Sequence, residues 1–72
     1  MSKPEHIYIR GLWDRVEEAI GKEDISKAEL ARRCGFDRKI LHGHTNMYLP
    51  YFARMCAELH VSADYLLFGK KG

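Results

Sequence analysis

Apolar residues recur at intervals of three and four along most of this chain, which is the spacing of helices that bury one face. In the first such segment, charged residues occupy the opposite, solvent-facing side, and these are Arg15, Glu17 and Glu18. The apolar face of the same segment consists of Leu12, Trp13, Val16, Ala19 and Ile20. We expect this helix to end at Gly21, because glycine favours the backbone turn that closes a helix.

Two short helices are predicted in the middle of the chain. Ser26 and Glu29 have the S-x-x-E spacing of a capping box, so a helix is expected to begin directly after Ser26. Its predicted apolar face is Ala28, Leu30, Ala31 and Cys34. Gly35 then supplies a turn of positive φ, and Asp37 is a good cap for a third helix. We expect Gly43 to end or weaken that helix, since an interior glycine costs about 1 kcal/mol.

Two more helices are predicted in the last third of the chain. Pro50 is acceptable in a first helical turn, Ser62 can cap the following helix, and Gly69 can close it. The apolar positions are Phe52, Met55, Cys56 and Leu59 in the fourth helix, and Tyr65, Leu66, Leu67 and Phe68 in the fifth. No segment alternates as a strand does, so the predicted fold class is all-α with about five helices.

The length of 72 residues limits the chain to one small core. Because a domain of this size buries only about 60% of its unfolded surface, we expect a second subunit to contribute stability in a homodimer. The two cysteines lie far apart among apolar neighbours, which favours a reduced, intracellular and therefore cytoplasmic protein. No apolar run has the length of a membrane span or a signal peptide, so no membrane partner is expected.

Positive charge is concentrated in the middle of the chain. The net charge of the whole chain is only +2. Residues 1–24 carry four basic and six acidic side chains, and residues 47–72 carry three basic and two acidic ones. Residues 25–46, in contrast, carry five basic against two acidic side chains, with His42 and His44 beside them. If one segment contacts an anion, it is this middle one.

Two stretches resemble the Cro/CI-type (XRE) helix-turn-helix family. Residues 26–36 are similar to its first helix and turn, in which a small residue is followed four residues later by glycine, here Ala31 and Gly35. Residues 55–69 are similar to its closing segment. The resemblance implies a five-helix, lambda-repressor-like DNA-binding domain over residues 10–69. Residues 1–9 would form an arm or a first turn, and residues 70–72 a frayed tail.

The resemblance also assigns candidate roles to individual residues. A recognition helix over about residues 38–45 would enter the major groove of DNA, with base contacts from Arg38, Lys39, His42 and Asn46. Arginine and lysine can donate to guanine, and asparagine can pair with adenine. The residues expected beside phosphates are Lys27, Asp37, Tyr48 and Tyr51. The residues expected to hold the helix pair together are Ala31, Gly35, Phe36 and Leu41. His60 stands where the family has a helix-ending glycine.

The implied function is sequence-specific binding of double-stranded DNA by a small transcriptional regulator, a repressor of a bacterium or prophage. We expect no enzyme activity, no cofactor, no metal and no small-molecule substrate. His42 and His44, two residues apart on a helix, point about 200° apart and cannot share a metal there. The candidate contacts of a homodimer are Leu66, Leu67 and Phe68, or Ile7 and Ile9. The alternative function is a protein-interaction module, antitoxin-like or a partner of a regulator, that uses the same fold with weak or no DNA binding.

Overall fold

The computed structural model describes residues 9–43 and 47–70, and this part of the chain is all-α. Its five helices are α1 (Leu12–Glu23), α2 (Lys27–Cys34), α3 (Lys39–Gly43), α4 (Leu49–Leu59) and α5 (Ala63–Phe68). The described residues contain no strand, so the predicted fold class is confirmed. None of these helices has the length and apolar character needed to cross a membrane.

The end of α1 differs from the prediction. The helix continues through Gly21 and ends at Asp24, whose φ of 56° lies in the left-handed region. The N–H of Asp24 donates to the carbonyl oxygen of Gly21 at 3.2 Å. The added turn brings Ile25 against the core, where it is partly buried. Burial of this side chain offsets the roughly 1 kcal/mol that a helical glycine costs.

The predicted ends of α2 are confirmed. Ser26 caps the helix, because its hydroxyl oxygen accepts from the N–H of Glu29 at 3.0 Å. Gly35 closes it with a φ of 84°. One position was wrong: Ala28 is exposed. The buried side chains of α2 are Leu30, Ala31 and Cys34, and at 100° per residue Ala28 lies about 110° from the centre of that face.

The later helices also begin and end largely as predicted. Pro50 lies in the first turn of α4. The hydroxyl of Ser62 caps α5 by accepting from the N–H of Tyr65 at 3.0 Å, and Gly69 closes that helix with a φ of 74°. His60 ends α4 with a φ of 57°, so a histidine takes the left-handed conformation that glycine usually supplies.

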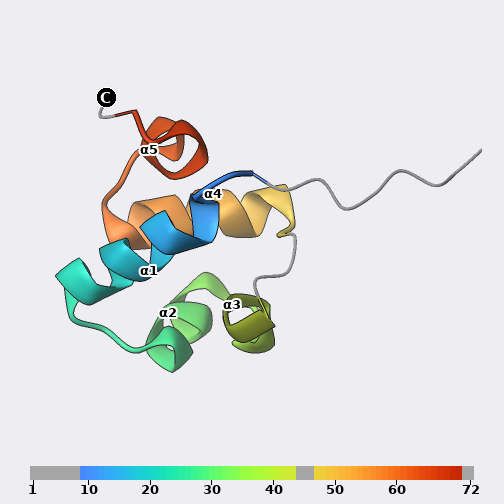
Figure 1. Cartoon of the computed structure of the whole chain (residues 1–72). Coiled ribbons are helices and arrows are strands. Elements are labelled where there is room, and N and C mark those ends of the chain that lie inside the picture. Colours follow the sequence, from blue (N-terminus) through green and yellow to red (C-terminus); the bar gives the residue numbers. More distant parts are fainter. Residues whose placement is uncertain (1–8, 44–46, 71–72) are drawn as a thin grey trace, which may run out of the picture.

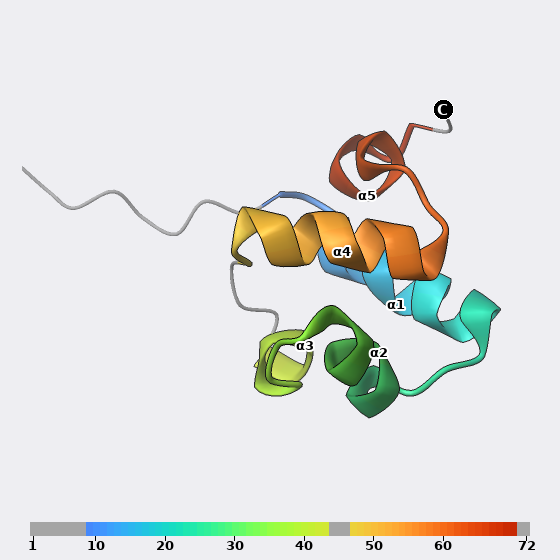
Figure 2. The ribbon, with the colours of Figure 1, turned by 180° about the vertical axis from the view of Figure 1, so that it is seen from behind.

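Helices α1 and α4 lie in the middle of the molecule, with α2 and α3 on one side and α5 on the other (Figures 1 and 2). Contacts join α1 to α4 and α5, and join α2 to α3 and α4. The side chains with the least exposure come from all five helices: Val16, Leu30, Leu41, Met55, Leu59 and Leu66. One core therefore holds α3 and α5 on opposite sides of the α1–α4 pair.

Candidate nucleic-acid interface

Helix α3 presents three nitrogen-bearing side chains to solvent. Arg38, Lys39 and His42 are exposed, whereas Leu41 is buried in the core. The backbone N–H groups of Leu41 and His42 donate to the carbonyl of Arg38 at 3.0 and 3.1 Å. Three of the four predicted base-contacting residues are therefore exposed within α3 or directly before it.

The fourth predicted base-contacting residue, Asn46, lies outside the described residues. His44 and the predicted end of the recognition helix near residue 45 also lie outside the described residues. Within the described residues, α3 spans Lys39–Gly43.

Asp37 caps α3, as its sequence position predicts. Its carboxylate oxygen Oδ1 accepts from the N–H of Lys39 at 2.9 Å. Its carbonyl oxygen accepts from the N–H of Ile40 at 3.0 Å. The carboxylate thus occupies one of the N–H groups that a phosphate would otherwise take at this helix start.

Lys27, a predicted phosphate contact, is already paired within the protein. Its Nζ lies 2.7 Å from Oε2 of Glu17 on α1, and its side chain is 28% exposed. A phosphate would have to share this ammonium group with Glu17 or displace that carboxylate. The pairing joins residues ten positions apart across two helices, which helix periodicity alone does not reveal.

Tyr48 and Tyr51 lie at the start of α4, and their rings pack against each other. Their ring centroids lie 5.4 Å apart in an edge-on arrangement. The ring of Tyr51 also lies 5.4 Å from that of Phe36, which precedes α3. Tyr51 is half-buried, whereas Tyr48 is 66% exposed. The aromatic chain from Phe36 to Tyr48 therefore connects the start of α4 to the segment that carries α3.

The residues predicted to hold α2 and α3 together lie in the core or in the turn between the two helices. Ala31 and Leu41 are buried, and Phe36 packs partly buried against the core. The N–H groups of Gly35 and Phe36 both donate to the carbonyl of Ala31, at 2.8 and 3.1 Å. These bonds satisfy a carbonyl at the end of α2 and set the turn toward α3.

The arginines of α2 are compensated by carboxylates. Arg32 and Arg33 both donate to Glu29, and Nη1 of Arg33 also lies 3.9 Å from Glu58 on α4. The hydrogen bonds from Arg32, followed by those from Arg33, lower the pKa of Glu29 to about 2. Within the part of the chain that the structure describes, Arg38 and Lys39 of the α3 segment pair with no carboxylate. Of the five lysines and arginines of residues 25–46, Arg38 and Lys39 are therefore the two left available to an anion.

The cysteines are buried, as predicted from their places on apolar stripes. Cys34 and Cys56 are both free thiols in the core. Burial raises the pKa of Cys34 to about 11 and raises that of Cys56 as well. Both side chains therefore stay as thiols near neutral pH, which is unfavourable for a nucleophile. Among residues 9–43 and 47–70, no three metal-ligating side chains gather in one place.

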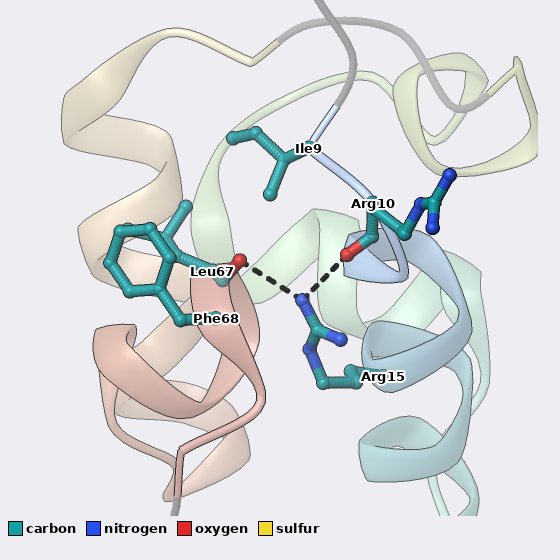
Figure 3. A pocket seen from close by; sticks show the side chains of 5 residues that line it. All are labelled: Ile9, Arg10, Arg15, Leu67 and Phe68. Atoms are coloured by element: carbon teal, nitrogen blue, oxygen red, sulfur yellow. Dashed lines mark hydrogen bonds between the residues drawn. The ribbon is translucent and has the colours of Figure 1, made fainter.

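The sequence analysis missed the role of Arg15. It was predicted on the solvent-facing side of α1, but it lies between α1 and α5. Its Nε donates to the carbonyl of Leu66 at 2.9 Å, and its Nη2 donates to the carbonyls of Arg10 and Leu67 at 2.9 and 3.0 Å (Figure 3). All three acceptors are backbone atoms, and those of Leu66 and Leu67 are more than 50 residues away, so no residue pattern could have revealed these bonds.

Comparison of the chain with family models, curated proteins and solved structures found no match. The resemblance to the Cro/CI-type family therefore rests on the sequence motifs alone.

Proposed function

We propose that this protein binds double-stranded DNA through α3 as a small transcriptional regulator, a repressor acting in the cytoplasm of a bacterium. The observation that carries the proposal is the outer surface of α3, where Arg38, Lys39 and His42 stand exposed while Leu41 anchors the helix to the core. In this proposal α2, the Gly35 turn and α3 act as a helix-turn-helix, with α3 in the major groove.

The positions of individual positive side chains support this assignment more strongly than the small net charge of the whole chain does. Contacts to phosphate supply most of the affinity of DNA-binding proteins, whereas donors on the inserted helix discriminate between bases. Arg38 and Lys39 are the donors suited to guanine. Tyr48 adds a hydroxyl at the start of α4. Lys27 adds a phosphate contact when its ammonium group leaves Glu17 and binds the DNA backbone. Bound protein would then block polymerase.

The test is fluorescence anisotropy of a labelled mixed-sequence duplex, titrated with protein at several salt concentrations between about 50 and 200 mM. We expect binding that weakens with salt. The double variant Arg38→Glu/Lys39→Glu, which puts two carboxylates in place of two cations beside the DNA, should bind at least tenfold more weakly.

The matched control is Lys22→Glu/Lys70→Glu, which makes the same change in net charge at exposed positions outside the α3 segment. We expect this control to weaken binding less than threefold. An equal loss in the two double variants would show that only net charge matters and would contradict the assignment of α3. If wild-type protein fails to bind any duplex at low salt, the alternative function, a protein-interaction module, replaces this proposal.

A homodimer remains part of the proposal, because two copies would contact half-sites about 34 Å apart on a near-palindromic operator. Of the predicted contacts, Leu66 is wrong, since it is fully buried, and Ile7 lies outside the described residues. Leu67, Phe68 and Ile9 are at least partly exposed, so they stay predicted contacts. We add Leu49, the most exposed large apolar residue described, with the exposed Ala53 one turn later. Sedimentation should show a dimer at tens of micromolar that Leu49→Ser dissociates. A wild-type monomer, with and without DNA, would contradict this part.

A further inference from the structure

A second surface lies on the side of the molecule opposite α3. It is an open hollow where the segment before α1 meets α5, lined by Ile9, Arg10, Arg15, Leu67 and Phe68 (Figure 3). Because α5 and α3 lie on opposite sides of the α1–α4 pair, this hollow is separate from the proposed DNA interface (Figures 1 and 2). A molecule bound here would leave α3 accessible.

The guanidinium of Arg15 is held in a fixed orientation in the hollow and still has donors to spare. Three backbone carbonyls accept from its Nε and Nη2 at 2.9 to 3.0 Å. No described residue accepts from its Nη1. Among the described residues no buried side-chain nitrogen or oxygen lacks a partner, so Nη1 must reach solvent.

The charge of Arg15 is also uncompensated. No carboxylate of residues 9–43 and 47–70 forms an ion pair with it, and its neighbour Arg10 adds a second guanidinium to the lining. An oriented guanidinium with free N–H groups is the group that proteins use to bind carboxylates. The polar part of the hollow is therefore complementary to an anion.

The apolar part of the hollow is exposed. Phe68 is 66% exposed and Ile9 is 41% exposed. In Figure 3 these two side chains project to the same side, whereas the side chain of Arg10 points away from them. A ligand that covered Phe68 and Ile9 would remove this apolar surface from water, which is the favourable term in most protein associations.

We propose that the hollow binds an acidic peptide segment of a partner protein, in which a carboxylate stands next to an apolar side chain. The carboxylate accepts from Nη1 of Arg15, and the apolar side chain packs on Phe68 and Ile9. A peptide fits an open hollow better than a fatty acid does, because a long acyl chain would stay exposed there. The protein would then hold DNA on one side and its partner on the other.

The test is fluorescence anisotropy with a labelled ten-residue peptide that carries two Glu-Leu pairs in a Gly-Ser background. A second peptide has glutamine in place of each glutamate. We expect wild-type protein to bind the glutamate peptide at least fivefold more tightly than the glutamine peptide. Phe68→Ser should weaken binding of the glutamate peptide at least fivefold, while Ala28→Ser, a control at an exposed apolar residue of α2, should change it less than twofold.

The contribution of charge is tested with Arg15→Gln, which should bind the two peptides equally if circular dichroism shows that it still folds. Arg10→Glu keeps the backbone carbonyl that Arg15 contacts. It should reduce the preference for the glutamate peptide over the glutamine peptide at least twofold. Lys22→Glu, which makes the same charge change on α1 away from the hollow, should leave the preference unchanged. DNA binding by Phe68→Ser should equal that of wild type, so this proposal can fail without the proposed function failing.

Equal binding of the glutamate and glutamine peptides by wild-type protein would overturn the proposal. So would equal effects of Phe68→Ser and Ala28→Ser on peptide binding. If sedimentation shows a wild-type dimer that Phe68→Ser dissociates, and no peptide binds, the hollow is an interface between two copies and not a peptide site.

Discussion

Replacing Gly11 with alanine should destabilise this protein more than replacing Gly35, although both glycines have positive φ. Gly11 has a φ of 77° and Gly35 a φ of 84°. A non-glycine residue in this region costs roughly 1–2 kcal/mol. At Gly35 an added Cβ meets nothing within 4 Å, so the backbone cost is the whole effect. At Gly11 the Cβ would lie 2.5 Å from Nη1 of Arg15.

The second cost at Gly11 comes from moving the Arg15 guanidinium. A free arginine would swing away cheaply, but this one donates to the carbonyls of Arg10, Leu66 and Leu67. At roughly 1 kcal/mol for each lost bond, a displacement that breaks two or three of these bonds adds about 2–3 kcal/mol. We therefore expect Gly11→Ala to cost about 3–5 kcal/mol, against about 1–2 kcal/mol for Gly35→Ala. A domain of this length has roughly 4–11 kcal/mol of stability in total.

The assay is urea unfolding followed by helical circular dichroism and by the fluorescence of Trp13, which is partly buried. Gly21→Ala serves as the control, because Gly21 is helical with open space around its added Cβ, and this variant should stabilise the protein by up to about 1 kcal/mol. If Gly11→Ala costs no more than Gly35→Ala, then Arg15 does not hold α5 to the start of α1.

Three further outcomes are expected. The folded-state pKa of Glu29 lies below its ordinary value of 4.5, at about 2, so its contribution to stability is present above pH 4.5 and is lost as the pH falls toward 2. Urea unfolding at pH 5 and 2.5 should show a smaller loss for Glu29→Gln than for wild type, and an equal loss would contradict the ion-pair assignment. Cys34 and Cys56 should resist alkylation at pH 8 until urea unfolds the chain, as followed by mass spectrometry, since burial raises both thiol pKa values. Ser26→Ala and Ser62→Ala should each lower the free energy of unfolding by about 1 kcal/mol in urea titrations, and no loss in either would show that the cap bonds contribute nothing.

Helix starts could be predicted from the sequence because capping is local. Ser26 and Ser62 each bond to an N–H only three residues away, so the sequence contains both partners. The end of α1 was harder to predict. Asp24 adopts the left-handed conformation that glycine prefers, and the packing of Ile25 directly after it against the core compensates for the strain.

The candidate interface could also be predicted only where its features depend on local sequence. The exposure of Arg38, Lys39 and His42 follows from helix periodicity once Leu41 is assigned to the core. The pairing of Lys27 with Glu17 and the contacts of Arg15 depend on how distant helices meet, and periodicity within one helix contains no information about that. The sequence therefore predicted which residues face outward at α3 but not which cations are already engaged.

The contacts of Arg15 also determine how this domain could be combined with others. They hold the carbonyl of Arg10 beside those of Leu66 and Leu67, so the chain enters and leaves the helical body at nearly the same place. Domains with adjacent entry and exit points tolerate insertion into a loop of a host protein. Placed in such a loop, this domain would be tethered at the α5 side, and α3 would face outward from the host.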